Sequence, residues 1–399
     1  MTKVAFWFDA PIEYSGGLNY IKNLLYALSL VNPGAVQPYV FFPTSVPDSV
    51  EREFSALATV VKTDLLKRRT LKWFVHRVCY RALGSMACAT ALLRSHGIEI
   101  VSHAWFVYSG RHPFRIISWI PDFQYLHLPE LFPTIDPADE TKRLQAIIAQ
   151  SDANILSSYS ALEDFKRIAP DKFVKRAKVI QFVSQPRSPS ANSTLTLSAL
   201  QSKYNFTEKY FYLPNQFWAH KNHIVVLQAL KILKGEGIDL LVVCTGTLVD
   251  YRYKDTPYVD SIYAFITENN LQDNVRILGM IDYDEVLFLM KHTTAVLNPS
   301  KFEGWSSSVE EAKSAGKKIL LSRIDVHLEQ APARGVYFDP DDARTLAHEM
   351  KNVWLHSNAE DELAATEAAN RSLRERTKAY GAAYLKLIDD VMNERNTLA

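Results

Sequence analysis

Residues 211–233 of the chain read FYLPNQFWAHKNHIVVLQALKIL. The apolar residues at the start of this segment predict a short buried strand, and a polar loop follows them. From His223 onward, apolar residues return at the spacing of a helix with one buried face. The segment therefore predicts a strand, a loop and an amphipathic helix, which is the repeating unit of a parallel-sheet α/β domain.

The same alternation of short apolar runs and helical patterns extends in both directions from this segment. In the second half of the chain we expect strands at Tyr210–Leu213, Leu240–Cys244, Val275–Leu278, Ala295–Leu297 and Lys318–Leu321. In the first half we expect strands at Val4–Phe8, Pro38–Phe42, Thr59–Val61, Ile98–Ser102, Ile116–Ile120, Asn154–Leu156 and Lys178–Gln181. The pattern predicts two doubly wound domains, in which ligands bind beyond the carboxyl ends of the strands.

The domain boundary is predicted within residues 182–198, FVSQPRSPSANSTLTLS. This stretch is rich in Ser, Pro and Thr and has no sustained periodicity, as is typical of a linker. We place the first domain at residues 1–190 and the second at 191–375. The tail, residues 376–399, is predicted to be helical and to pack back on the first domain.

Composition excludes several classes of protein. The chain has 45 Lys and Arg against 44 Asp and Glu, so no overall charge attracts nucleic acid. Its three cysteines are too few and too scattered for a disulfide framework or a zinc site, which favours a reducing, cytoplasmic setting. No uncharged apolar run reaches 18 residues and no signal peptide is recognisable, so we expect neither membrane spanning nor secretion.

The most informative segment is residues 298–322, NPSKFEGWSSSVEEAKSAGKKILLS. Ser307 and Glu310 have the spacing of a capping box, which predicts a helix from Ser308 that Gly316 ends. Unpaired amides at the start of this helix suit a pyrophosphate, and Glu311 would be free to accept hydrogen bonds from two vicinal hydroxyls. The alternative is a solvated acidic helix start, because Asp and Glu are favoured there by the helix dipole alone.

Glu303 and Glu311 are separated by seven residues, and EGWSSSVEEAKSAGK resembles the E-x7-E segment of the retaining family 4 glycosyltransferases. The resemblance implies the GT-B fold, in which two Rossmann-like domains face each other across a cleft. It also implies that Glu311 binds the donor ribose, and that Glu303 and the residues after it hold the sugar and diphosphate, namely Gly304, Trp305, Ser306 and Ser307.

Lys221 stands where the helix of the opening segment begins, a position that favours a lysine only if an anion is shared. Relatives place an arginine five residues earlier, and both residues contact the diphosphate. Gln216 occupies that position here, so Lys221 either acts with neutral donors or is joined by another cation. His220 and His223 are near enough to compensate, although surface or capping roles are the alternative.

Three residues of the first half are expected to contribute to the site. Gly16 and Gly17 resemble the glycine loop that relatives place opposite the donor phosphates, although a strand-to-helix turn also explains them. Asp122 corresponds to the aspartate of the family's His-Asp loop, while Pro121 replaces the histidine. Asp122 would then orient a sugar hydroxyl or support charge in the transition state, and the alternative is an Asp that closes a turn.

Residues 274–290, NVRILGMIDYDEVLFLM, carry two further features. In relatives the backbone after this strand meets the nucleobase, which selects Gly279 and Met280. Asp282 and Asp284 match the D-x-D pattern of metal-dependent transferases, but Asp282 and Glu285 also have capping-box spacing. We interpret the pattern as a helix cap and predict neither a catalytic metal nor a cofactor.

Residues 65–93 combine six basic residues with Trp73, Phe74, Val78 and Leu83. A basic amphipathic helix of this kind could rest on anionic lipid and meet a lipid-linked acceptor. The alternative is a helix that buries its apolar face in its own domain.

Together with these features, the resemblance to the family 4 glycosyltransferases implies a retaining, metal-independent hexosyltransferase. It would move a sugar from a nucleotide-sugar donor to a glycan or lipid-linked glycan in surface polysaccharide synthesis, such as that of lipopolysaccharide. Glu303, Lys221 and Asp122 would be its catalytic residues. The enzyme would work in the cytoplasm or peripherally on the inner face of the membrane. The alternatives are a non-catalytic GT-B partner subunit, which Gln216 and Pro121 favour, and a nucleotide-sugar 2-epimerase.

Overall fold

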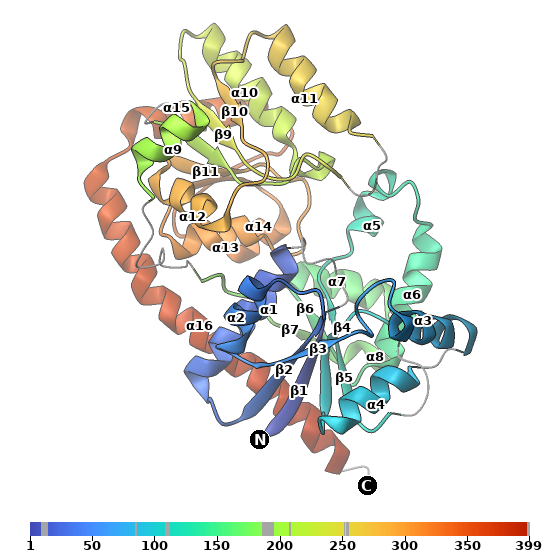
Figure 1. Cartoon of the computed structure of the whole chain (residues 1–399). Helices are drawn as coiled ribbons and strands as arrows, with labels where there is room; N and C mark the ends of the chain where they lie inside the picture. The colour runs from blue at the N-terminus through green and yellow to red at the C-terminus, as the bar shows by residue number, and fades with distance from the viewer. Residues whose placement is uncertain are drawn as a thin grey trace. The chain divides into compact units, whose positions relative to one another are not determined.

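A computed structural model describes residues 1–8, 15–83, 86–107, 112–185, 195–206, 209–250, 252 and 255–396 (Figure 1). The chain forms two compact units. The first comprises Met1–Phe123, Ile135–Val183 and Glu375–Ala399, and the second comprises Gln124–Thr134 and Ser184–Arg374. The chain therefore passes between the units within residues 182–198, the stretch whose composition indicates a linker.

The first unit is built on a parallel sheet with the strand order β3-β2-β1-β4-β5-β6-β7. Its strands are β1 (Thr2–Trp7), β2 (Val36–Pro43), β3 (Thr59–Thr63), β4 (Ile100–Ala104), β5 (Arg115–Ile120), β6 (Ala153–Leu156) and β7 (Ala177–Val179). Its helices are α1 (Ser15–Val31), α2 (Asp48–Ser55), α3 (Leu71–Leu83), α4 (Ala87–Ser95), α6 (Pro137–Gln150), α7 (Tyr159–Ile168) and α8 (Asp171–Val174). Consecutive buried residues in β1, β2 and β6 show that helices cover both faces of the sheet.

The second unit is built on a parallel sheet with the strand order β10-β9-β8-β11-β12-β13. Its strands are β8 (Phe211–Leu213), β9 (Val242–Cys244), β10 (Val275–Ile277), β11 (Ala295–Asn298), β12 (Ile319–Ser322) and β13 (Gly335–Phe338). The elements between them are α9 (Leu197–Tyr204), η2 (Ala219–Lys221), α10 (His223–Gly235), α11 (Pro257–Glu268), α12 (Tyr283–His292), α13 (Ser307–Ser314), α14 (Asp325–Gln330) and α15 (Ala343–His356).

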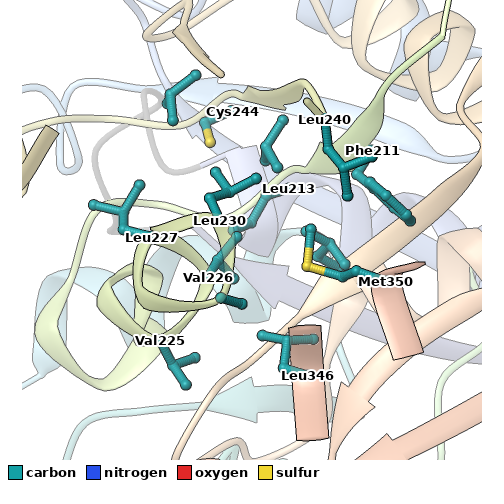
Figure 2. Close-up of a cluster of buried hydrophobic side chains, with 14 of the residues drawn as sticks. Phe211, Leu213, Val225, Val226, Leu227, Leu230, Leu240, Cys244, Leu346 and Met350 are labelled. Carbon is teal, nitrogen blue, oxygen red and sulfur yellow. The ribbon is translucent and has the colours of Figure 1, made fainter. Parts of the chain in front are cut away.

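The core of the second unit explains why the opening segment forms a strand and a helix. Phe211 and Leu213 of β8 point to the same face of the sheet and are at most 1% exposed. Val226 and Leu230 of α10 pack against them, and Met350 of α15 joins the same cluster (Figure 2). The period of two in the strand and of four in the helix therefore converges on one core.

Helix α16 (Ala359–Asn396) contributes to both units. In the second unit, Glu362 forms ion pairs with Lys317 and Arg334. In the first unit, the Tyr384 hydroxyl donates a hydrogen bond of 2.6 Å to the Ser102 hydroxyl. A Cβ atom at Gly381 would lie 2.6 Å from the Ala27 carbonyl oxygen, so glycine permits the close approach of α16 to α1.

Residues Gln124–Thr134 contain α5 (Gln124–His127) and η1 (Pro129–Leu131) and group with the second unit, although sequence analysis places them in the first domain. The His127 ring lies 5.0 Å from the Phe302 ring. The Arg252 guanidinium lies 5.1 Å from the Phe132 ring and pairs with Asp250. These side-chain contacts attach the segment to the loops that follow β9 and β11.

Each of the twelve strands expected from the sequence is present, with ends shifted by at most a few residues. β13 was not expected. It is only four residues long, lies at the edge of its sheet and buries only Phe338 fully, so its apolar pattern is weak.

Candidate functional site

The loops after β8 and β11 meet at the point where the second sheet reverses its strand order. From β8 the chain proceeds to β9 and β10 on one side, and from β11 it proceeds to β12 and β13 on the other. β8 and β11 are paired neighbours, so the residues that follow them lie at the same edge of the sheet. Lys221 follows β8 and Glu303 follows β11. This is the position at which doubly wound sheets bind ligands.

Lys221 and Glu303 form an ion pair in this crevice. The Lys221 Nζ lies 2.7 Å from the Glu303 Oε1, and the two side chains are 14% and 8% exposed. The Ser300 hydroxyl donates a second hydrogen bond of 2.7 Å to the same carboxylate oxygen. Lys221 lies in η2, immediately before α10, as the sequence predicts. Glu303 therefore provides the negative charge that Lys221 requires at the start of a helix.

A buried polar network fixes the loop between β11 and α13. Asn298, the last residue of β11, accepts a hydrogen bond from the Ser300 backbone N–H and donates to the hydroxyls of Ser306 and Ser308. Asn215, which follows β8, donates to Asn298 and accepts from Ser308. All five residues are at most 4% exposed. Because every partner is buried, these bonds hold the loop in one conformation.

Gln330 of α14 holds the same loop from the other side. Its side-chain oxygen accepts a hydrogen bond of 3.2 Å from the Ser306 backbone N–H, and its amide nitrogen donates 3.0 Å to the Ser306 carbonyl. Gln330 also donates to Glu310 at 3.3 Å. The Ser306 amide, expected to be available to a ligand, is therefore already bonded within the protein.

The capping box predicted for this helix is wrong. Helix α13 begins at Ser307, its N-cap is Ser306, and no side chain makes a capping hydrogen bond. The N-cap residue is thus Ser306 and not the predicted Ser307, while Glu310 is 1% exposed and contacts Gln330 and Lys313. The tertiary partners of Glu310 thus override the local motif.

The predicted end of α13 at Gly316 is confirmed. Gly316 has a φ angle of 69°, its N–H bonds to the Lys313 carbonyl, and the Lys317 N–H bonds to the Ala312 carbonyl. This pair of bonds is the Schellman arrangement that ends a helix with a left-handed residue. Gly304 and Trp305, between Glu303 and the helix start, are partly buried.

Glu311 lies one turn inside α13 and is 8% exposed. Its Oε1 accepts a hydrogen bond of 2.7 Å from the Tyr283 hydroxyl. Burial raises the pKa of Glu311 from 4.5 to about 7, and the hydrogen bond from Tyr283 opposes this rise. The alternative of a solvated acidic helix start is therefore wrong, since Glu310 and Glu311 are both buried.

The raised pKa of Glu311 predicts a pH-dependent cost in stability. Between pH 4.5 and about 7 the unfolded chain loses the Glu311 proton while the folded chain retains it, so the free energy of unfolding falls as pH rises through this window. We expect Glu311→Gln to remove this cost and to gain about 3 kcal/mol relative to wild type between pH 4 and pH 8. Urea titrations at the two pH values would measure it. Glu268→Gln, at an exposed glutamate of α11, should show no such gain, and an equal gain in both variants would contradict the prediction.

His220 and His223 do not supply the charge that Gln216 lacks. Both side chains are at most 5% exposed, and burial holds the pKa of His220 well below its ordinary value and lowers the pKa of His223 to about 3. The His223 ring stacks on Phe217 with a centroid distance of 4.2 Å. Both histidines are therefore neutral, buried residues, and Gln216 lies partly buried in the same loop.

Gly279 and Met280 lie after β10, which is separated from β8 by β9. Gly279 accepts a hydrogen bond of 2.9 Å from the Gly246 N–H, which belongs to the loop after β9. The Met280 side chain is 61% exposed. These residues share the carboxyl edge of the sheet with Lys221 and Glu303.

The D-x-D pattern lies at a helix start, as predicted. Asp282 is the N-cap of α12, and its backbone N–H donates to the Glu285 carboxylate, which is half of a capping box. Glu285 also bonds to Lys203 and Tyr204, each at 2.7 Å. Within the described ranges, His, Cys, Asp and Glu side chains form no cluster of three or more that could hold a metal ion.

Gly16, Gly17 and Asp122 belong to the first unit. The two glycines lie in the first turn of α1, Gly17 buried and Gly16 exposed, while residues 9–14 before them lie outside the described part of the chain. Asp122 follows β5 and is partly buried. His103 is structural: its ring bonds to Ser102 and Tyr20, and burial lowers its pKa to about 3.

Sequence comparison identifies the family of the second unit. Residues 200–372, which contain Lys221, Glu303 and Glu311, match the model of the family described as glycosyl transferases group 1. The match spans most of the second unit and less than half of the chain. The E-x7-E resemblance is thus confirmed at the level of this family.

Two curated proteins resemble part of the chain. The O-antigen chain mannosyltransferase RfbU of Salmonella typhimurium is 25% identical over 177 residues, which are 44% of this chain and 47% of RfbU. The phosphatidylinositol N-acetylglucosaminyltransferase gpi3 subunit of Schizosaccharomyces pombe is 23% identical over 195 residues, 44% of this chain and 43% of that protein. The chain spans about half the length of these relatives.

Solved structures resemble the whole chain. A glycosyltransferase from Rickettsia africae has a TM-score of 0.67 and 14% identity, and the similarity covers 100% of this chain and 98% of that one. The Anabaena protein Alr3699/HepE in complex with UDP-glucose has a TM-score of 0.61 and 14% identity, covering 100% and 99%. WaaG, a glycosyltransferase involved in lipopolysaccharide biosynthesis, has a TM-score of 0.56 and 14% identity, covering 95% of each chain. The two parallel-sheet units therefore form the predicted GT-B fold.

Proposed function

We propose that the protein moves a hexosyl group from a nucleotide-sugar donor to a glycan or lipid-linked glycan acceptor, with retention of anomeric configuration. The observation that carries the proposal is the Lys221–Glu303 ion pair at the switch point of the glycosyl transferase domain, beside the buried Glu311. The three residues combine one cation for a phosphate with two carboxylates for hydroxyl groups. The complex of HepE with UDP-glucose supports a nucleotide-sugar donor for this fold.

In this proposal the donor diphosphate lies beside Lys221 and the Glu303–Ser307 loop, and Glu311 accepts hydrogen bonds from the ribose. Gly279 and Met280 contact the base. In the free protein Glu303 already compensates the charge of Lys221, so the donor phosphate competes with a carboxylate that is held in place by Ser300. Glu303 is then available to accept a hydrogen bond from a hydroxyl of the donor sugar.

The proposed reaction breaks the bond between the anomeric carbon and the phosphate oxygen and forms a bond from that carbon to the acceptor oxygen. The leaving phosphate takes the acceptor proton, so no protein base is required. Lys221 stabilises the charge that develops on the leaving diphosphate, which is the role that a divalent ion has in metal-dependent transferases. Asp122 would orient a sugar hydroxyl or support charge in the transition state, and Gly16 and Gly17 would contact the donor phosphates.

The names of the relatives support a role in surface polysaccharide synthesis. RfbU is an O-antigen chain mannosyltransferase and WaaG is involved in lipopolysaccharide biosynthesis. We therefore propose a cytoplasmic enzyme that works at the inner face of the membrane, where a lipid-linked acceptor would be presented.

A screen of nucleotide sugars and free nucleotides by thermal shift, with EDTA present, tests the proposal. We expect a saturable rise in the melting temperature with one base, because a ligand that binds only the folded state stabilises it in proportion to its saturation. The same compounds should then be assayed for turnover with glycan acceptors. No shift with any nucleotide would contradict the transferase proposal.

The screen also separates the two other candidates. A non-catalytic partner subunit would bind the donor and show no turnover with any acceptor, and Gln216 and Pro121 are the departures that favour this candidate. A 2-epimerase would convert the donor with no acceptor present. A requirement for added metal would contradict the metal-independent mechanism.

A further inference from the structure

Helix α3 exposes an apolar stripe. Leu71, Phe74, Val75 and Val78 are 78%, 59%, 43% and 46% exposed, and their spacing places them on one helix face. The opposite face carries Trp73, His76 and Tyr80, which face the domain together with Trp7, Leu66 and Met86. We call the exposed set of Leu71, Phe74, Val75 and Val78 the α3 stripe. Of the apolar residues that the sequence analysis names in this segment, Phe74 and Val78 are exposed, whereas Trp73 is partly buried and faces the domain.

Positive charge surrounds the α3 stripe. Residues 65–98 contain seven Lys and Arg residues and no Asp or Glu. Lys67, Arg68, Arg69, Lys72 and Arg81 are exposed, and none of them forms an ion pair with another described residue. Other helices of the same unit neutralise their surface lysines, as in the Lys142–Asp139 and Lys166–Glu163 pairs. The charge around α3 is therefore uncompensated.

A groove runs beside the stripe. It has a volume of about 310 Å³ and is lined by Trp73, Phe74, Arg77, Val78, Arg81 and Ala82. The side chain of Leu83 and residues 84–85 lie outside the described residues. Its lining combines four apolar residues with Arg77 and Arg81. A lipid presents the complementary pair, an acyl chain and an anionic headgroup.

We propose that α3 docks on an anionic lipid bilayer, with the α3 stripe in the boundary between headgroups and acyl chains and the basic residues on the headgroups. An amphipathic helix with a basic polar face lies in the plane of the interface in this way. Each Lys or Arg near an anionic surface adds attraction that falls with ionic strength. No described helix is long and apolar enough to cross a bilayer, so the contact is peripheral.

Charge argues against a second copy of the chain as the occupant. A symmetric pairing through α3 would place the same patch of each copy against the other. Seven basic residues from each copy would then meet with no acidic residue in the segment, and like charges brought together at an interface oppose binding. An anionic membrane satisfies both the apolar and the charged parts of the surface.

Vesicle sedimentation of the full chain tests the proposal. We expect binding to vesicles of phosphatidylcholine with phosphatidylglycerol, little binding to phosphatidylcholine alone, and weaker binding as salt is raised. Phe74→Ser/Val78→Ser should lower the partition coefficient at least about tenfold. Arg68→Glu/Lys72→Glu should lower it by a similar factor at low salt. All four side chains are exposed, and neither Arg68 nor Lys72 forms an ion pair with a described residue, so we expect the fold to be retained, which circular dichroism would check.

Matched controls change residues of the same kind in the second unit. Leu355→Ser/Leu363→Ser replaces two leucines that are 61% and 66% exposed, and Lys291→Glu/Arg371→Glu reverses two exposed charges. Both controls should bind vesicles like wild type. The proposal would be overturned if wild type bound neither kind of vesicle or bound both kinds equally. It would also be overturned if Phe74→Ser/Val78→Ser bound vesicles as strongly as wild type. A wild-type dimer that Phe74→Ser/Val78→Ser converts to a monomer would overturn it too.

This inference rests on the proposed function in one respect: the lipid-linked acceptor would lie in the same membrane on which α3 docks. Vesicle binding requires no nucleotide sugar, and the thermal shift with donor requires no lipid. The α3 variants should therefore keep the donor-induced shift of wild type. Vesicle binding by a protein whose melting temperature no donor raises would support the membrane-docking proposal and contradict the proposed transferase activity.

Discussion

Lys221→Met is expected to lower kcat by a factor of about 100 to 1000, because it removes the one cation that the proposal places on the leaving diphosphate. Lys301→Met provides a matched control, since Lys301 lies two residues before Glu303 and pairs with the exposed Asp341. That control should keep kcat within about twofold of wild type. Steady-state kinetics with the donor identified by thermal shift would measure both variants. Near-normal kcat in Lys221→Met would contradict the proposed mechanism.

A second variant separates catalysis from folding in this experiment. Lys221→Met leaves Glu303 buried without its partner charge, which costs about 3–5 kcal/mol of stability. The double variant Lys221→Met/Glu303→Gln removes both charges and should recover most of that loss. We expect the double variant to be at least as inactive as Lys221→Met, because Glu303 is itself proposed to bind the donor sugar. Recovery of activity together with stability would show that Lys221 has only a structural role.

Glu311→Ala is expected to weaken donor binding about 10- to 100-fold, because hydrogen bonds from ribose hydroxyls to a carboxylate are of the charged kind. Calorimetric titration with the nucleotide product would measure the loss of affinity. An analogue of the same nucleotide that lacks the ribose hydroxyls should bind wild type and Glu311→Ala with equal affinity. Glu268→Ala, at the exposed end of α11, should bind like wild type. Equal affinities in all three proteins would remove Glu311 from the donor site.

The Tyr283 hydroxyl helps to interpret this result. In the free protein it donates to Glu311, so it occupies one of the positions that a ribose hydroxyl would take. Tyr283→Phe therefore distinguishes the loss of the carboxylate from the loss of its internal hydrogen bond, because it keeps the Glu311 carboxylate and removes only the Tyr283 hydroxyl. Donor binding that survives in Tyr283→Phe and fails in Glu311→Ala assigns the loss to the carboxylate.

The strands could be predicted because parallel-sheet strands are buried on both faces and so are continuous apolar runs. Phe211–Leu213 and Ile319–Ser322 are examples, each wholly buried. Edge strand β13 was not predicted, because three of its four residues are only partly buried and its apolar pattern is correspondingly weak. The grouping of Gln124–Thr134 with the second unit was also not visible in the sequence, because it depends on contacts such as Arg252 with Phe132 that join distant positions.

The site was predicted where charge and spacing are local, and missed where partners are remote. Lys221 and Glu303 stand out in the sequence, although their pairing across 82 residues does not. Asn215, Asn298 and Gln330 were missed, because single polar residues in loops or at element ends carry no periodic signal. The capping box failed for the same reason: Gln330, 20 residues away, bonds to Glu310. The roles of the site residues toward a donor remain predictions.

Helix α16 has a consequence for the order in which the protein is completed during synthesis. Tyr380, Tyr384 and Leu387 are at most 3% exposed in the first unit, yet they follow every residue of the second unit in the chain. The second unit has all its residues by Arg374. The first unit therefore closes its core only after the residues beyond Arg374 have been made, and a nascent chain stopped before α16 exposes the apolar surface that this helix covers.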